Sequence, residues 1–294
     1  QIHHIPLRVV QTESNFEKEL ASFLKEQNIS IRDRKLIYPF ELDIVLAEWN
    51  LAIECNGNYW HSIGHDSLRD KTYHQKKTEL VESKGYQLLH IREWEWNNKR
   101  DIIQSMILAK VNKIENKIYA RKCKIKMVEL SIAKEFYETN HIQGYHHAKQ
   151  HYGLYHGGSL VFMCSFSKSP RIKNSIELIR MATLLNTQVV GGASKLIKYF
   201  IRENNINELY SYANRDYSTG KVYESLGFKF IKKTSPSYEY YDGNNFISRF
   251  KFQKHKHHIP KEITETEYFL SQGYRIYYNS GNKLYKLSTV EIKR

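Results

Sequence analysis

The chain has 294 residues, which is enough for two domains of ordinary size that each bury a core. Hydrophobic residues make up 41% of it, and no apolar run approaches the roughly 18 residues of a membrane span, so the composition excludes a membrane-spanning protein. The net charge of +14 comes from residues 121–294, because residues 1–120 hold 17 Lys/Arg and 17 Asp/Glu. A basic part joined to a neutral part favours polyanion binding by the basic part; the alternative is a generally basic, solubilising surface.

The cysteines are few and widely spaced: Cys55, Cys123 and Cys164. This usage fits reduced thiols better than a disulfide framework. We therefore expect a cytoplasmic protein without a signal peptide, in the host cytoplasm if the gene belongs to a phage.

Residues 14–56 predict a helix followed by two strands. Ser14 and Glu17 have the spacing of a capping box, which predicts a helix over 15–27. The apolar runs 42–46 and 51–55 predict two strands joined by a turn. The buried stripe of the helix is expected to consist of Phe16, Leu20, Phe23 and Leu24.

Two carboxylates lie on these strands. Side-chain alternation places Glu54 and Asn56 on one face of the second strand, and Asp43 on the first strand can approach them. Mg²⁺ binds oxygen ligands and usually takes one or two protein carboxylates, leaving room for water and phosphate. We therefore expect Asp43 and Glu54 to bind Mg²⁺, with Mn²⁺ as a substitute, for phosphodiester hydrolysis by a metal-activated water.

His61 follows the carboxylate strand within a few residues. An imidazole with a pKa near 6.5 can accept a proton from water or donate one to a leaving oxygen, although most lone histidines are structural. His74 and Lys77 lie on the next predicted helix. The remaining elements of this part are expected to be a helix over 66–84, a strand over 86–96 and a helix over 99–116.

The segments EKELASFL, LAIECNGNYWHS and Gly-Tyr-x-Leu-Leu, with Asp43 between the first two, resemble the very-short-patch-repair (Vsr) type endonucleases and the related phage homing endonucleases of the PD-(D/E)XK superfamily (EDxHD type). The resemblance covers residues 14 to about 96. It implies a mixed sheet flanked by helices and cleavage of double-stranded DNA. By position it assigns the helix glutamate to Glu17, the central metal-binding aspartate to Asp43, the catalytic histidine to His61 and a metal-binding backbone carbonyl to Cys55.

The sequence departs from this pattern at two positions. Asn56 stands where the wider superfamily has a lysine, so the water-orienting role would fall to Lys77, His74 or His61. Glu54 replaces an apolar residue of the repair enzymes.

Structural roles are the alternative for the two glutamates. Glu17 could merely cap its helix, with Glu19 as the second candidate for the functional glutamate, and Glu54 could merely pair with a lysine.

From about residue 120 the pattern predicts strands and helices in an order that resembles the GNAT acyltransferase superfamily. A hairpin at Gly157-Gly158 and a strand over 176–185 precede the loop Gln188-x-x-Gly191-x-Ala193, and Tyr223-Glu-Ser-Leu-Gly-Phe228 follows. The resemblance implies that the loop cradles a coenzyme A pyrophosphate at a helix N-terminus. The alternative is an ordinary tight connection.

Basic residues alternate with aromatic ones in residues 249–261, a composition typical of phosphate contacts and base stacking. The histidines in this stretch lack a cysteine pair at zinc-ligand spacing. The expected nucleic-acid contacts are Asn56, Lys195, Arg215, Lys254, His255 and Lys256.

The chain is thus predicted to be an α/β (α+β) protein with a nuclease domain over 1–118, a GNAT-like domain over 119–253 that binds DNA, and a basic C-terminal extension over 254–294. The expected function is metal-dependent cleavage of double-stranded DNA, and cutting both strands would call for a homodimer. The alternatives are an acyltransferase acting on nucleic acid and a DNA-binding protein with an inactive nuclease fold.

Overall fold

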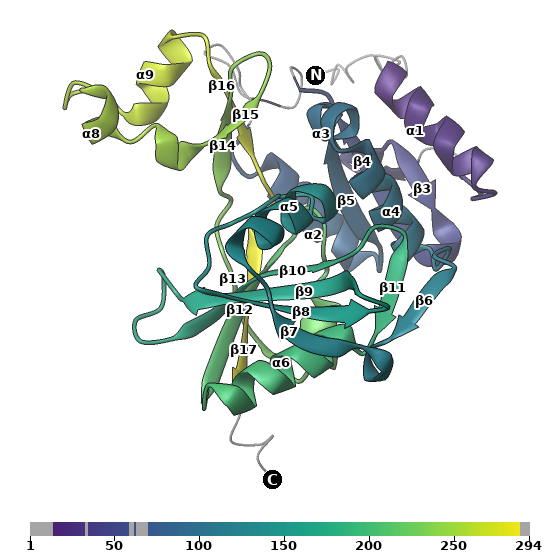
Figure 1. The fold of residues 1–294 in the computed structure, drawn as a ribbon. Coiled ribbons are helices and arrows are strands. Elements are labelled where there is room, and N and C mark those ends of the chain that lie inside the picture. Colours follow the sequence, from purple (N-terminus) through teal and green to yellow (C-terminus); the bar gives the residue numbers. More distant parts are fainter. Residues whose placement is uncertain (1–13, 33–34, 59–61, 63–69, 289–294) are drawn as a thin grey trace, which may run out of the picture.

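The computed structural model describes residues 14–32, 35–58, 62 and 70–288. Helices and mixed β-sheets alternate along this part of the chain, which confirms the expected α/β class (Figure 1). No helix in the described ranges is long and apolar enough to cross a membrane. All three cysteines are buried thiols without a disulfide.

The N-terminal part, up to residue 110, is built on the three-stranded sheet β3-β4-β5. Strands β3 and β4 are antiparallel and β4 and β5 are parallel, while β1 and β2 form a separate hairpin. The elements are α1 (Asn15–Glu26), β1 (Lys35–Ile37), β2 (Phe40–Leu42), β3 (Ile44–Leu46), β4 (Leu51–Asn56), α2 (Tyr73–Ser83), β5 (Gln87–Arg92), α3 (Glu93–Asn98) and α4 (Arg100–Lys110).

Helices cover both faces of this sheet, so every residue of β4 is buried. Leu51 and Ile53 pack in one cluster with the apolar stripe of α1 and with α4, whereas Ala52 packs with Val81 of α2. Because side chains alternate along a strand, Glu54 faces α2. The predicted stripe of α1 is confirmed, and Ser14 caps that helix by accepting from the Glu17 N–H.

Three predicted element boundaries were wrong. The helix expected over 99–116 ends at Lys110. The strand expected over 86–96 ends at Arg92, because the Glu95 carboxylate accepts the Arg92 N–H and starts helix α3. The helix expected from residue 66 is observed from Tyr73, residues 63–69 lying outside the described part.

The second part contains a seven-stranded sheet of order β13-β17-β12-β10-β9-β8-β7. The pair β10–β12 is parallel and the other neighbours are antiparallel, including the predicted β8–β9 hairpin. The elements are β7 (Lys124–Met127), α5 (Leu130–Asn140), β8 (Gln150–His156), β9 (Ser159–Lys168), β10 (Ile176–Thr183), α6 (Gly192–Glu203), β12 (Glu208–Asn214), α7 (Lys221–Ser225), β13 (Lys229–Lys233) and β17 (Asn282–Ser288).

The predicted boundary at residue 253 falls within a small unit inserted between β13 and β17. This unit has its own core, which includes Tyr240, Phe252 and Phe269. Strand β17 then returns to the large sheet, so residues 254–294 do not form a separate extension. The unit comprises β14 (Tyr238–Tyr241), β15 (Phe246–Ser248), η3 (Arg249–Lys251), α8 (Lys254–His257), α9 (Glu265–Ser271) and β16 (Arg275–Tyr278).

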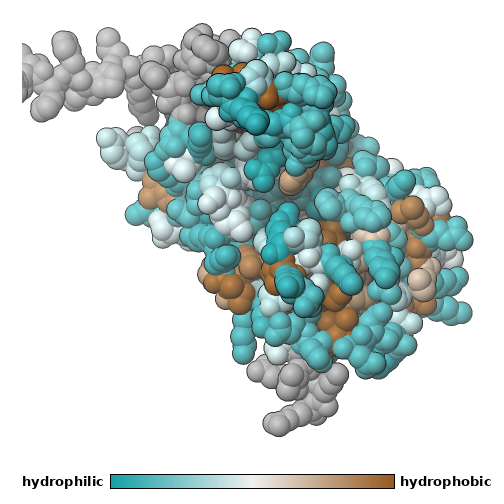
Figure 2. Space-filling model, turned by 90° about the vertical axis from the view of Figure 1, so that its left-hand side faces the viewer, coloured by the Kyte–Doolittle hydropathy of each residue, from teal (hydrophilic) through white to brown (hydrophobic). Residues whose placement is uncertain are grey.

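The side of the molecule that carries α8 and α9 has a largely hydrophilic surface with scattered hydrophobic patches (Figure 2). One exposed apolar residue in this unit is Phe250, of which 57% is accessible. The stretch 249–261 that contains it has five Lys/Arg and no Asp or Glu.

A connecting segment joins the two parts. Strand β6 (Asn116–Tyr119) pairs in parallel with β11 (Thr187–Val190), and the turn η2 (Ala120–Lys122) leads into β7. Tyr217 from the second part packs in the same apolar cluster as α1 and α4.

Candidate active site

A buried Lys–Glu pair lies between β4 and α2. The Lys77 ammonium donates to Oε1 of Glu54, and both side chains are almost fully buried. Alternation along β4 turns Glu54 toward α2, and Lys77 lies on the face of α2 that covers the sheet. Oε2 of Glu54 has no hydrogen-bond partner within the described part of the chain.

Asp43 lies beside this pair. It connects β2 to β3, and its Oδ2 accepts the Cys55 N–H at 2.8 Å. Cys55 is the neighbour of Glu54 on β4, so this bond ties Asp43 to the strand that carries the buried glutamate. Asp43 is half-buried, whereas Glu54 is 2% exposed.

The charges of these residues act on one another. Burial, together with the negative charges of Asp43 and Glu17, raises the pKa of Glu54 to about 8 against the opposing effect of Lys77. Burial lowers the pKa of Lys77, but Glu54, Tyr73 and Asp43 outweigh it and hold the pKa above the ordinary value. The three acids therefore form one electrostatically coupled cluster around a retained ammonium.

Glu17 and Glu19 differ in burial and in their effect on this pair. Glu17 is buried on α1, and its charge raises the pKa of Glu54. Glu19 is exposed, and its carboxylate accepts from Trp96 Nε1 at 3.0 Å and pairs with Arg100 at 2.6 Å. Of the two candidates from the sequence, Glu17 is therefore the one whose charge acts on Glu54.

His74 lies one turn before Lys77 and is buried. Its Nδ1 is 2.6 Å from the backbone oxygen of Tyr278 and its ring stacks on Tyr277, with centroids 4.7 Å apart. A carbonyl oxygen only accepts, so Nδ1 carries the proton. His74 thus anchors α2 to β16.

Asn56 was expected to contact nucleic acid, but its side chain is buried. Its Nδ2 donates to the Tyr277 hydroxyl at 3.2 Å and lies 3.3 Å from His90 Nδ1. In this position it does not lie on the molecular surface and belongs to the polar surroundings of Glu54.

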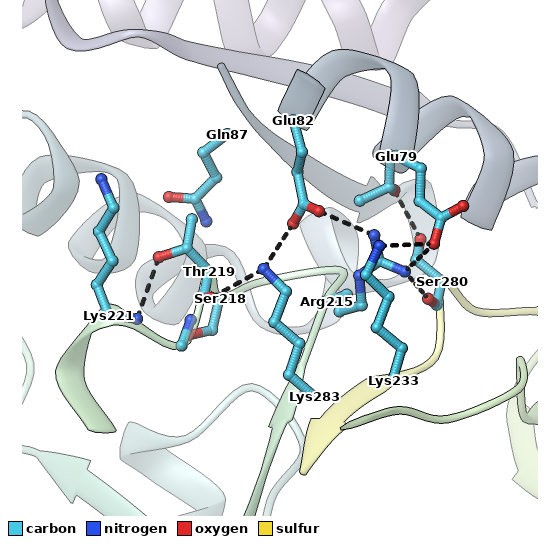
Figure 3. Close-up of polar contacts among 12 residues, drawn as sticks. Glu79, Glu82, Gln87, Arg215, Ser218, Thr219, Lys221, Lys233, Ser280 and Lys283 are labelled. Atoms are coloured by element: carbon cyan, nitrogen blue, oxygen red, sulfur yellow. Dashed lines mark hydrogen bonds and ion pairs between the residues drawn. The ribbon is translucent and has the colours of Figure 1, made fainter. Parts of the chain in front are cut away.

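Arg215 and Lys195, two further residues expected to contact DNA, are also engaged inside the protein. The Arg215 guanidinium is fully buried and pairs with Glu79 and Glu82 of α2 (Figure 3). Lys195 Nζ donates to the backbone oxygens of Ala120 and Cys123 at 2.9 and 2.6 Å. Their positive charges therefore serve contacts within the chain.

The other expected DNA contacts lie in the inserted unit. His255 and Lys256 are exposed on α8, and Lys254 is half-buried. Lys254 and Lys256 donate to nearby backbone oxygens. A backbone oxygen does not neutralise an ammonium, so the surface of α8 stays basic.

His61 lies outside the described residues. Within the described ranges, no three His, Cys, Asp or Glu side chains are arranged to bind a metal ion. The metal ligands Asp43, Glu54 and Cys55 and the catalytic role of His61 therefore stay predictions.

Several residues next to Glu54 were not singled out from the sequence. His90 is in register with Glu54 across the β4–β5 pair, and Thr78 follows Lys77 on α2. Tyr277 and Ser280, from the C-terminal part of the chain, are hydrogen-bonded to Asn56 and Thr78, respectively.

No family model and no curated protein matches this sequence. Among solved structures, the catalytic domain of the homing endonuclease I-Bth0305I is 24% identical and aligns with 35% of this chain and all of that domain, at a TM-score of 0.28.

Acetyltransferases align with a larger share of the chain. A Bacillus subtilis acetyltransferase in complex with CoA is 12% identical over 57% of this chain and 99% of its own, at a TM-score of 0.34. The ribosomal-protein-S18-alanine N-acetyltransferase from Escherichia coli is 12% identical over 56% of this chain and 93% of its own, at a TM-score of 0.37. At these scores the similarities assign no function to either part.

Proposed function

We propose that this chain is a metal-dependent DNA endonuclease whose catalytic centre lies in the N-terminal part. The observation that carries the proposal is the buried Lys77–Glu54 pair next to Asp43, with Glu17 in electrostatic range. Burying an ammonium and a carboxylate costs desolvation free energy. Coupled groups with shifted pKa values are typical of catalytic sites, so we assign the pair to function.

The residues present fit a magnesium ion. Its preferred ligands are oxygens, and Oε2 of Glu54 is a buried acceptor without a partner among the described residues. Asp43 is bonded to the N–H of Cys55, the residue that follows Glu54 on β4. Asp43, Glu54 and the backbone carbonyl of Cys55 would hold the ion.

Lys77 supplies the positive charge of the absent strand lysine in this proposal. Its ammonium holds Oε1 of Glu54 and so fixes the carboxylate with the other oxygen available. A bound Mg²⁺ supplies charge neutralisation at the phosphate and lowers the pKa of a water. Lys77 adds a fixed positive charge, and Glu17 keeps the cluster negative enough to attract a cation.

The proposal is tested by incubating the protein with a pool of supercoiled plasmids that carry random inserts, with Mg²⁺, Mn²⁺ or a chelator. Open-circle or linear product that requires metal would support it. The described part of each chain has one such cluster, so we expect nicks in one strand, and cutting both strands would require two chains or two events. Absence of product with either metal would contradict the proposal.

Metal binding should strengthen with pH. Because Mg²⁺ binds the ionised carboxylate, a Glu54 pKa of about 8 means that binding releases a proton below that pH. We expect the Mg²⁺-induced rise in melting temperature to grow between about pH 6 and 8 and then to level off. Glu54→Gln should remove the rise at every pH. An equal Mg²⁺ effect throughout the pH range would contradict this assignment.

The metal-free protein should respond in the opposite direction. The folded-state pKa of Glu54 lies above the ordinary value of 4.5, so its contribution to stability is complete below that value and is lost as the pH rises through about 8. The same melting curves without Mg²⁺ measure this loss.

The inserted unit is the surface that we propose for DNA binding. Lys251 and Lys256 are exposed beside Phe250, and no ion pair to either is seen in the described part of the chain. The Arg92 guanidinium, at the end of the strand next to β4, lies 4.3 Å from the Phe246 ring of this unit. The inserted unit therefore contacts the end of β5, the strand next to β4.

Replacing Lys251 and Lys256 by alanine should weaken DNA binding and reduce the slope of log affinity against log salt by about 2, because each lysine neutralises one phosphate. Fluorescence anisotropy on a random-sequence duplex at several salt concentrations measures the slope. The matched control replaces two exposed lysines of the neutral part, Lys18 and Lys25, and should leave it unchanged. Equal slopes for both double variants would remove the inserted unit from the proposal.

The alternative function, acyl transfer, would use the loop Gln188–Ala193. In the structure, Val190 ends a strand paired with β6, and Lys195 holds the turn η2 against the start of α6. A side-chain carbon on Gly191 would lie 3.8 Å from Ala120 Cβ. Strand β6 and the turn η2 thus pack against the loop to which the resemblance assigns a pyrophosphate.

Coenzyme A should therefore leave the melting temperature unchanged. A ligand at about a hundred times its Kd would stabilise the folded state by about 2.7 kcal/mol, which a thermal scan detects easily. Acetyl-CoA and desulfo-CoA serve as companion ligands. A clear rise with coenzyme A would favour the acyltransferase instead.

A further inference from the structure

The polar residues around Glu54 are bonded to the far end of the chain. The Tyr277 hydroxyl accepts from Asn56 Nδ2 at 3.2 Å, and Thr78 Oγ1 donates to Ser280 Oγ at 2.9 Å. The backbone N–H of His90 donates to the carbonyl of Asp216 at 2.9 Å. The elements that carry the Lys77–Glu54 pair are therefore each held by the second part.

The bond to Ser280 sets the direction of the hydrogen bond between Thr78 and His90. The Thr78 hydroxyl gives its proton to Ser280, so it must accept one from His90 Nε2, which is 2.7 Å away. A neutral imidazole protonated at Nε2 presents Nδ1 as an acceptor, and Asn56 Nδ2 lies 3.3 Å from it.

The Asn56 amide is thus oriented, with its nitrogen toward His90 and Tyr277. Its Oδ1 is buried and has no hydrogen-bond partner among residues 14–32, 35–58, 62 and 70–288. Glu54 is two residues away on the same face of β4, and its Oε2 is likewise buried without a hydrogen-bond partner among the described residues. Two buried acceptors on one strand face can take the two protons of one water molecule.

We propose that Asn56 orients the attacking water and that Tyr277 and Ser280, from the C-terminal part, are positioning residues that hold the Asn56 amide in place. This inference rests on the proposed nuclease function. The water donates one proton to Asn56 Oδ1 and one to Glu54 Oε2, and the second lone pair of that carboxylate oxygen remains for the metal ion. Asn56 then performs the orienting step for which the wider superfamily has a lysine.

The Tyr277 hydroxyl can be separated from the packing of its ring. The ring stacks on His74 and lies 5.2 Å from the Arg92 guanidinium, contacts that phenylalanine would keep. Tyr277→Phe therefore removes only the bond to Asn56. Tyr240 provides a matched control, because it lies in the same small sheet, is fully buried, and its hydroxyl has no partner among the described residues.

The experiment measures cleavage of the plasmid pool with Mn²⁺ for Tyr277→Phe, Tyr240→Phe, Asn56→Leu and Asp43→Ala. We expect Tyr277→Phe to lower kcat about tenfold with KM and melting temperature unchanged, and Asn56→Leu to lower kcat about a hundredfold. Tyr240→Phe should cleave like the wild type. Nitrogen NMR of His90 should show the Nε2–H tautomer in the wild type.

Each result decides the question. Wild-type kcat in Tyr277→Phe or Asn56→Leu, with Asp43→Ala inactive, overturns this inference and leaves the nuclease in place. A fall in melting temperature and DNA affinity that matches the fall in kcat assigns the hydroxyl to packing and also overturns it. No cleavage by the wild type removes the proposed function and the inference together.

Discussion

Asp43→Ala is expected to lower metal-dependent DNA cleavage by at least about 1,000-fold, the largest effect of any single change in the proposed centre. The charge of Asp43 is the second largest influence on the pKa of Glu54, after burial. Without it, a cation would lose a carboxylate ligand. The measurement is the rate of conversion of supercoiled plasmid with Mg²⁺ or Mn²⁺.

Asp43→Asn separates this loss from a loss of structure. Asparagine can still accept the Cys55 N–H, so the link between Asp43 and β4 is retained while the charge is removed. We expect a normal melting temperature in the absence of metal, no Mg²⁺-induced stabilisation, and no cleavage. Cleavage by Asp43→Asn at the wild-type rate would refute the role of this carboxylate.

The two glutamates of α1 provide an internal comparison for the same assay. Glu17→Gln removes a buried charge that acts on Glu54 and should reduce the rate, whereas Glu19→Gln affects an exposed carboxylate engaged with Trp96 and Arg100 and should stay within about twofold of the wild type. The reverse result would move the functional role to Glu19.

The double variant Glu79→Ala/Glu82→Ala should lower the free energy of unfolding by about 3 to 5 kcal/mol, because it leaves the buried Arg215 without a counter-ion. Arg215 contacts these carboxylates at 3.2 and 2.9 Å and is closed to solvent. The remaining contact is to the backbone oxygen of Ser280, which does not neutralise a charge (Figure 3). Urea denaturation measures the change.

Two controls identify the cause of this destabilisation. Glu203→Ala removes an exposed ion pair with Arg202 and should cost less than about 1 kcal/mol. Adding Arg215→Met to the double variant removes the stranded charge and should restore part of the stability. A double variant that unfolds at the wild-type urea concentration would show that these contacts contribute little to joining the two parts.

Local signals predicted much of the N-terminal part. The spacing of Phe16, Leu20, Phe23 and Leu24 predicted the buried face of α1, and two short apolar runs predicted β3 and β4. The proximity of Asp43 to Glu54 follows from such adjacent strands and could be anticipated. What these residues bind stays a prediction.

Contacts between distant segments could not be predicted in this way. Tyr277 meets Asn56 across 221 positions of sequence and Arg215 meets Glu82 across 133, and no short-range periodicity relates such pairs. Lys195 and Arg215 looked like DNA contacts because sequence shows a charge but not its partner. Helix α3 was missed because one Arg92–Glu95 cap overrides a run of residues that favour strands.

Strand β17 is the last strand in the chain, yet it lies between β12 and β13 in the sheet. During synthesis on the ribosome, these two strands must wait with unpaired edges until residues 282–288 have emerged. The segment that supplies Tyr277 and Ser280 also emerges late, after the whole N-terminal part. A chain that stops before this point would have an open sheet and an unsupported Asn56, so an incomplete translation product would lack the assembled candidate site.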